Sequence, residues 1–375
     1  MSSSVRNILL ATALVTATGG AFAARQGVVP STLQNPLRIS MLADSSSAQA
    51  FMGSVQFKIS NNSAEVLKVP YWQLPGASQE NKLFQVFHDG KRVEYLGALV
   101  KRPAPTEADL VVFQPYETKL VTVDLSQSYD LGKTGEYTVS FVSFLDGART
   151  GNGRRLAGSN GRMASLQSVP LKLWVDADNQ LKALKGGVTA QGKPGGGGTQ
   201  VNGITYVGCS STQITDAAAG VAQARVYSEN AKGYLAGHSG SNFGPRYTTW
   251  FGAYTSTRYA TANQHFVAID SAIDQSGGQI KINCGCNQSY YAYVYPTKPY
   301  EIFVCKAFWT APTAGTDSKG GTLIHETSHF NVVAGTADVV YGQTGAKSLA
   351  ISNPDQALNN ADSHEYFAEN QPSQQ

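Results

Sequence analysis

Short apolar runs give the first half of the chain a strand-like pattern. Turn signals such as Asn61-Asn62, Asp89-Gly90 and Gly132-Lys133 lie among these runs. Many short strands separated by turns predict an antiparallel β-sandwich, which we assign to residues 24–185. The predicted strands cover residues 55–60, 84–88, 110–113, 119–124, 136–142 and 170–175.

The second half mixes helical and strand patterns. A long alanine-rich helix is predicted over residues 213–236, and short strands are predicted over 279–283, 291–295 and 301–305. We therefore expect residues 204–375 to form a separate α+β domain. The segment between the halves, residues 186–203, is rich in glycine and has the composition of a flexible linker.

The N-terminus has the pattern of an export signal. Arg6 precedes an apolar run from Ile8 to Val15, and small residues follow up to Ala23. This pattern predicts a signal peptide over residues 1–23 and a secreted, extracellular protein. A membrane anchor is the alternative, but threonines interrupt the run, which is too short to span a bilayer. No other stretch approaches that length, so we expect no membrane span in the mature form.

Composition and charge fit a globular protein with two parts. The chain has 375 residues, of which 42% are hydrophobic and 15% are charged, so disorder is not its general state. From Thr205 onward there are 9 Lys and Arg against 12 Asp and Glu, whereas the whole chain has 29 against 26. The two parts therefore carry net charges of opposite sign, which favours their docking.

Residues 325–329, HETSH, have the spacing of a catalytic zinc site. On a helix, His325 and His329 are four residues apart, so both imidazoles project from one face and can bind one Zn²⁺. Glu326 lies beside the first ligand, where its carboxylate can take a proton from a metal-bound water. We expect Gly335 to end this helix.

A catalytic zinc site needs a third protein ligand, because the fourth position holds water. After Gly335, Thr336 is expected to cap a new turn that places Asp338 and Tyr341 on one side. Asp338 is therefore the predicted third ligand. The candidates considered downstream are Asp338, Asp355, Asp362, His364, Glu365 and Glu369.

The motif H-E-x-x-H followed by G-T-x-D-x-x-Y-G resembles the aspzincin metallopeptidases, the family of deuterolysin and peptidyl-Lys metalloendopeptidase. The resemblance spans roughly residues 204–372. It implies that His325, His329 and Asp338 bind one zinc ion per chain. It also implies that Glu326 is the general base and that Tyr341 donates a hydrogen bond to the developing oxyanion.

The four cysteines all lie in the second half of the chain. An even number of cysteines in an exported protein predicts two disulfides, and four cysteines allow three pairings. The resemblance implies the pairs Cys209–Cys284 and Cys286–Cys305. A metal or redox site at Cys-x-Cys is the alternative, but the export signal argues for oxidised cysteines.

A segment near the C-terminus, NNADSHEYFAEN, carries the candidate specificity residues. Asp362 and Glu365 are three residues apart and share a face if the segment is helical. From spacing alone, a solvated acidic face is the more ordinary interpretation. Peptidyl-Lys metalloendopeptidases carry N-A-D-x-x-E-Y here, and this resemblance implies cleavage on the amino side of lysine with both carboxylates binding its ammonium group.

The resemblance also implies that residues 24–185 are a propeptide, because mature relatives begin near the position of Thr205. No cysteine precedes Cys209, so a thiolate latch on the zinc is excluded. We expect steric inhibition by the protein's own prodomain, with a basic loop such as Lys101-Arg102 or Arg154-Arg155 in the cleft. Lys193, in the predicted linker, is a candidate self-cleavage point.

The sequence therefore predicts a secreted zinc endopeptidase made as a zymogen, acting on lysine-containing proteins or peptides. Two alternatives are a surface binding protein with an inert zincin-like half and a zinc hydrolase with a non-peptide substrate. No nucleic-acid partner is expected. His88, His238 and His265 are interpreted as structural or exposed, and His364 as a neighbour of the acidic pocket that does not bind metal.

Overall fold

The computed structural model describes residues 32–43, 53–76, 79–177, 198–238 and 240–374. The predicted signal peptide and most of the predicted linker, including Lys193, lie outside these residues. From Thr32 onward the chain forms one compact unit. Within it, a β-rich N-terminal region and an α+β C-terminal region have separate hydrophobic cores.

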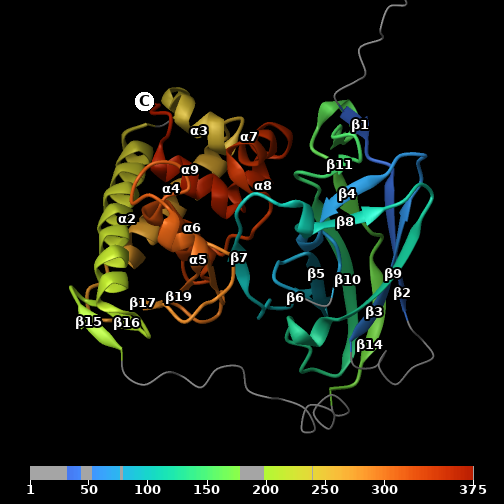
Figure 1. The fold of residues 1–375 in the computed structure, drawn as a ribbon, viewed down its shortest axis with the longest axis horizontal. Coiled ribbons are helices and arrows are strands. Elements are labelled where there is room, and N and C mark those ends of the chain that lie inside the picture. The colour runs from blue at the N-terminus through green and yellow to red at the C-terminus, as the bar shows by residue number, and fades with distance from the viewer. Residues whose placement is uncertain (1–31, 44–52, 77–78, 178–197, 239, 375) are drawn as a thin grey trace, which may run out of the picture. The chain divides into compact units, whose positions relative to one another are not determined.

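Three sheets build the N-terminal region, and Figure 1 labels most of their strands. The first has the order β1 (Thr32–Gln34), β12 (Arg155–Ala157), β11 (Arg149–Thr150), β4 (Leu67–Pro70) and β8 (Leu110–Phe113). The second has the order β13 (Ser165–Gln167), β10 (Gly135–Phe144), β5 (Phe84–His88) and β6 (Lys91–Arg92), with β14 (Leu171–Val175) also paired to β10. The third has the order β2 (Leu37–Ala43), β3 (Ser54–Asn61) and β9 (Thr118–Asp124).

All six strands predicted for this region are present, with bounds that differ by at most two residues. The alternating pattern explains them, because every second residue of β3 faces the core. Phe57 of β3 packs against Phe84 and Phe141, with ring centroids 5.6 and 6.0 Å away. Short single-turn helices join the strands: η2 (Tyr71–Gln73), η3 (Glu107–Asp109), η4 (Leu125–Gln127) and η5 (Ser159–Gly161).

The C-terminal region combines helices with one sheet, as predicted. Its helices are α2 (Ser211–Gly237), α3 (Gly244–Phe251), α4 (Ser256–Ile273), α5 (Lys306–Thr310), α6 (Lys319–His329), α7 (Gly342–Ser352), α8 (Pro354–Leu358) and α9 (Ala361–Glu369), with a short turn η6 (Gly240–Asn242). Among the described helices, none is both long and apolar enough to cross a bilayer.

The sheet of this region has six strands in the order β15 (Thr199–Val201), β16 (Ile204–Val207), β17 (Lys281–Asn283), β19 (Glu301–Val304), β18 (Ala292–Val294) and β7 (Leu99–Lys101). Strand β15 falls inside the segment predicted to be a linker, and it pairs with β16. The three predicted strands correspond to β17, β18 and β19.

The sixth strand of this sheet, β7, comes from the N-terminal region. It pairs antiparallel with β18, so that Lys101 lies opposite Ala292 and Leu99 lies opposite Val294. The N–H of Tyr291 extends the ladder by donating to the Lys101 carbonyl at 3.0 Å. Strand β7 packs beside α6, and it therefore brings a segment of the β-rich region to the predicted zinc helix.

Two disulfides join elements of the C-terminal region. They connect Cys209 to Cys284 and Cys286 to Cys305, which confirms the pairing implied by the resemblance. The first links the ends of β16 and β17. The second brackets β18, since it joins the loop before that strand to the end of β19.

Candidate active site

Helix α6 carries the HETSH motif and is buried along its whole length. It begins at a serine cap, because the Ser318 hydroxyl accepts a hydrogen bond from the Gly321 N–H at 2.9 Å. A Cβ at Gly320 would meet the Gln223 side chain of α2 at 2.8 Å. The paired glycines therefore let α6 approach its neighbours closely.

The helix ends at His329, so the prediction that it continues to Gly335 is wrong. Phe330 leaves the helical conformation and is fully buried in the core. Packing of this aromatic ring, including its edge contact with Tyr300, replaces the glycine stop that the sequence suggested. Gly335 has a φ of +61° in the loop that follows.

His325, His329 and Asp338 form a buried trio. The Asp338 Oδ1 atom lies 3.0 Å from His325 Nε2 and 3.3 Å from His329 Nε2. The Nδ1 atom of His329 lies 3.1 Å from the Thr336 carbonyl, and its Nε2 has no hydrogen-bond partner. Two imidazole nitrogens and one carboxylate oxygen at this spacing fit the donor set of a catalytic zinc site.

The segment from Thr336 to Tyr341 forms neither a helix nor a turn, so the predicted capped turn is wrong. The Thr336 hydroxyl contacts that of Ser328 at 2.6 Å and caps no helix. Asn360 fixes the segment instead, because its Oδ1 accepts the N–H groups of Val339 and Val340, both at 3.1 Å. These bonds place Asp338 against the histidines.

Glu326 and Tyr341 supply the remaining groups near the trio. Both carboxylate oxygens of Glu326 are buried without a hydrogen-bond partner, and burial raises the pKa of this carboxyl well above its usual range. Burial also raises the pKa of Tyr341, so its phenol keeps its proton. The Tyr341 hydroxyl donates a hydrogen bond to the Val100 carbonyl at 2.7 Å.

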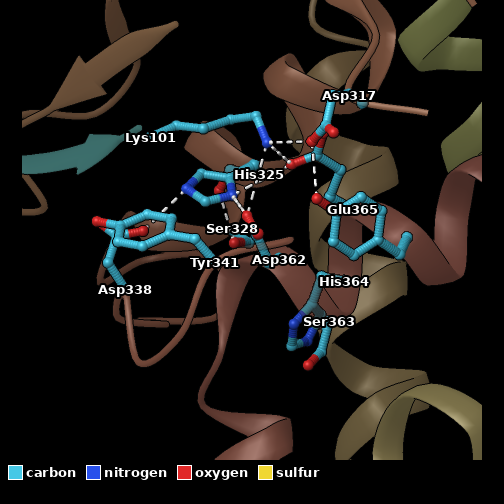
Figure 2. A network of polar contacts seen from close by, with 12 residues as sticks. Lys101, Asp317, His325, Ser328, Asp338, Tyr341, Asp362, Ser363, His364 and Glu365 are labelled. Atoms are coloured by element: carbon cyan, nitrogen blue, oxygen red, sulfur yellow. Dashed lines mark hydrogen bonds and ion pairs between the residues drawn. The ribbon is translucent and has the colours of Figure 1, made fainter. Parts of the chain in front are cut away.

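Asp362 and Glu365 line an acidic pocket on α9, and the structure fills this pocket with Lys101. Figure 2 shows the Lys101 side chain extending toward these carboxylates. Its Nζ lies 2.6 Å from Glu365, 3.3 Å from Asp317 and 3.6 Å from Asp362. The side chain is 1% exposed. Burial lowers the pKa of Lys101, but the three carboxylates outweigh this effect and raise it well above the usual value.

The pocket and the metal trio share one imidazole. His325 points its Nε2 at Asp338, while its Nδ1 lies 2.8 Å from Asp362 and 3.3 Å from Glu365. Burial lowers the pKa of His325, yet contacts with these three carboxylates raise it well above the usual value. His325, Asp362 and Glu365 are also spaced to hold a cation. The Lys101 ammonium occupies that position.

Asp317 is a pocket residue that sequence reasoning did not assign. It lies on the loop before α6, and the Tyr366 hydroxyl donates to it at 2.7 Å. Two ring contacts complete the pocket, because the Lys101 Nζ lies 5.0 Å from the Tyr291 ring centroid and 5.8 Å from that of Tyr366. No motif spacing pointed to Asp317, since it lies 45 positions before Asp362.

Of the two basic loops considered for the cleft, the structure places Lys101-Arg102 there. Arg102 contacts the Tyr290 ring of the C-terminal region and pairs with Glu80 at 2.5 Å. Arg154 instead pairs with Glu65 inside the β-rich region. The inserted segment is therefore the stretch from Leu99 to Arg102.

The other candidates take no part in the trio. Asp355 pairs with Arg258 on the surface, and Glu369 accepts the N–H of Ser318. His364 and His265 contact each other at 2.9 Å, and burial lowers the pKa of His364 to about 3. The remaining histidines have local contacts: His238 with the Tyr234 carbonyl and His88 with the Tyr137 ring.

Comparisons with known proteins identify one family of peptidases. A family model of the aspzincins, described as lysine-specific metallo-endopeptidase, matches residues 236–369. An extracellular protease of Aeromonas hydrophila is 40% identical over 320 residues, which cover 85% of this chain and 88% of that protein. A peptidyl-Lys metalloendopeptidase of Pleurotus ostreatus is 53% identical over 169 residues, covering 45% of this chain and 98% of that one.

A peptidyl-Lys metalloendopeptidase of Grifola frondosa is 36% identical over 292 residues, which cover 76% of each chain. The solved structure of a zinc peptidase from the same organism is 45% identical, covers 44% of this chain and all of that chain, and superposes with a TM-score of 0.42.

Proposed function

Because the chain belongs to the aspzincin metallopeptidases and is a zinc metalloendopeptidase, we propose that it cuts peptide bonds on the amino side of lysine and that its β-rich region holds it inactive. The observation that carries the proposal is the burial of Lys101 among Asp317, Asp362 and Glu365. This lysine occupies the position that we assign to the lysine of a substrate.

His325, His329 and Asp338 would hold the zinc ion, one per chain. When bound, zinc polarises a carbonyl and acidifies its water. Glu326, with both oxygens unpaired, is assigned as the base that accepts the proton of that water. The protonated Tyr341 phenol is assigned as a hydrogen-bond donor to the carbonyl oxygen as negative charge develops there.

The lysine preference is supported by the chemistry of the pocket. A site in which Asp362 and Glu365 are buried and Asp317 adds a third carboxylate stabilises a cation and disfavours a neutral or anionic side chain. The Lys101 ammonium contacts all three carboxylates from one position, and it also lies over the Tyr291 and Tyr366 rings. Relatives from three fungi that carry the name peptidyl-Lys metalloendopeptidase support the same preference.

Inhibition by the protein's own prodomain is supported by the position of β7 at the edge of the C-terminal sheet. It covers the outer edge of β18, where an extended peptide would otherwise add as a strand. The Val100 N–H also donates to Asp338 Oδ2 at 2.8 Å. The segment from Leu99 to Lys101 thus occupies the edge of β18, fills the acidic pocket and contacts Asp338. A peptide substrate cannot bind at these places at the same time. We therefore assign residues 24–185 as the propeptide of a zymogen, released by cutting within residues 186–203.

We also propose that the protein is secreted through the signal peptide at residues 1–23. The two disulfides favour an oxidising compartment, and the Aeromonas relative carries the name extracellular protease.

The test is to cut the linker with an added protease, supply zinc, and digest a mixture of denatured proteins. We expect lysine at the first position of most new N-termini. Glu326→Gln should retain zinc but lose at least about 10³-fold in kcat/KM, whereas the control Asp355→Asn on the surface should retain activity. Products without a lysine preference would contradict the pocket assignment. The absence of any proteolysis would favour the binding-protein or non-peptide hydrolase alternatives.

A further inference from the structure

We propose that the Val100–Lys101 bond is itself a substrate, cut in cis by the active site that it covers. This inference rests on the proposed function, because it takes the chain to be a peptidase specific for the amino side of lysine. It concerns a bond within the β-rich region, distinct from the candidate point at Lys193 in the linker.

The bond lies in the register expected of a substrate. Cleavage on the amino side of a lysine breaks the bond between that lysine and the carbonyl before it, here the carbonyl of Val100. That carbonyl accepts the Tyr341 hydroxyl at 2.7 Å, while the Lys101 side chain fills the acidic pocket. Leu99 and Lys101 on either side are paired to β18. Both ends of the same peptide bond are thus held by groups assigned to the reaction.

The reaction needs only water as co-reactant. Water adds to the Val100 carbonyl carbon, and Glu326 takes one of its protons. The C–N bond then breaks, and this proton and the second proton of the water both pass to the departing Lys101 nitrogen. The products are a carboxylate at Val100 and an α-ammonium group at Lys101. Glu326 is regenerated in its original state.

The cut would loosen the grip of the β-rich region on the cleft. Strand β7 pairs with β18 as one continuous segment from Leu99 to Lys101. Cleavage between Val100 and Lys101 would divide that segment, so the peptide bond would no longer hold its two parts together in the cleft.

The two fragments would remain associated after the cut. Strand pairs that cross the cleaved position, β4 with β8, β3 with β9 and β5 with β10, connect residues before Val100 to residues after Lys101. No disulfide spans the bond, because all four cysteines follow it. The expected product is a nicked but folded β-rich region whose fragments separate only on denaturation.

The experiment uses the full-length precursor, purified with a chelator and then given excess zinc. Samples taken over time are denatured, and the fragments are identified by N-terminal sequencing and intact mass. We expect a fragment beginning at Lys101, formed at a rate independent of protein concentration. Glu326→Gln should form none, and Lys101→Gln should lose this fragment alone. Lys172→Gln, at an exposed lysine of the same region, should leave the fragment unchanged.

A lysine peptide is assayed in parallel with the same preparation after the linker has been cut. If that peptide is cleaved but no chain begins at Lys101, the inference is overturned and the proposed function stands. If the peptide is not cleaved, the proposed function is contradicted, and the inference that rests on it falls with it. Formation of the Lys101 fragment at a rate proportional to protein concentration would overturn the assignment in cis.

Discussion

The Nδ1 atom of His325 lies 2.8 Å from Oδ1 of Asp362, and the same carboxylate oxygen lies 3.6 Å from the Lys101 ammonium. One carboxylate thus faces both the lysine pocket and an imidazole of the metal trio. Its second oxygen accepts the Gly342 N–H at 2.6 Å, which holds the group in place. On the proposed function, lysine recognition and the orientation of a metal ligand would therefore share a side chain.

Asp362→Asn is expected to weaken zinc binding as well as lysine preference. Loss of a carboxylate behind a ligating histidine costs about 10- to 100-fold in metal affinity. Glu365→Gln is the matched comparison, because Glu365 lies farther from Nδ1, at 3.3 Å, and nearest to the ammonium. It should lose lysine preference while keeping most of the zinc affinity. Titration with a competing chelator measures the difference, and equal zinc affinities would contradict this role of Asp362.

Lys101→Gln is expected to release the β-rich region from the protease once the linker is cut. Removing the cation leaves Asp362 and Glu365 buried without their partner, at a cost of about 3–5 kcal/mol. That corresponds to docking weaker by on the order of 10²–10⁴-fold. The measurement is residual activity against a lysine peptide as the linker-cut protein is diluted. Lys172→Gln should behave as wild type, and unchanged inhibition by Lys101→Gln would rule out the pocket contact as the main restraint.

Tyr341→Phe is expected to lower kcat by on the order of 10²-fold with little change in KM. A single hydrogen-bond donor to an oxyanion contributes at about this level, and its effect is confined to the transition state. Steady-state kinetics on a lysine peptide would check this. A change confined to KM would indicate that the phenol only positions substrate.

Docking of the β-rich region is expected to weaken as pH rises from about 4 to about 6. Burial raises the pKa of Asp146 to about 6, and a Cβ at Gly345 on α7 would collide with this carboxyl group. Because the pKa is raised in the docked state, that state binds the proton more tightly, and its advantage is lost as the group ionises.

Asp146→Asn should remove this pH dependence of docking and strengthen docking at pH 7.5 by about 1–3 kcal/mol. Affinity of the linker-cut protein for its β-rich region, measured at pH 4.5 and 7.5, gives the comparison. A wild-type pH profile that persists in Asp146→Asn would assign the effect to another group.

The two disulfides should contribute differently to stability and activity. Cys209–Cys284 closes a loop with a sequence separation of 75 and Cys286–Cys305 one of 19. Chain entropy predicts losses of about 4 and about 3 kcal/mol on replacing each pair by serine. The smaller loop contains β18, so its loss should cost more activity. Urea unfolding and peptide assays of the paired variants test both expectations.

Much of the site could be predicted because its residues are close in sequence. His325 and His329 share a helix face by spacing alone, and Asp362 and Glu365 share a face of α9 for the same reason. Six strands of the β-rich region followed from their turns and apolar runs, whereas others, such as β2 and β4, were not predicted. The end of α6 did not, because the burial of Phe330 decides it and no local stop signal marks that position.

Other features depend on contacts between distant segments. Strand β7 has only three residues and forms by pairing with the edge of β18. A segment this short shows no alternation of apolar and polar residues from which a strand could be predicted. Asp317 joins the pocket from a loop. The contact between His325 and Asp362 joins two helices 37 positions apart. These placements arise from the tertiary fold, which local sequence patterns do not encode.

Strand β18 has β19 on one side and β7 on the other. A bare strand edge offers unpaired N–H and C=O groups to any passing chain and is a common starting point for aggregation. While β7 is in place, that edge of a newly made molecule is closed to strands of other molecules. If the β-rich region is released as we propose, the edge of β18 becomes open to strands of other molecules at the same time as it becomes open to a peptide substrate.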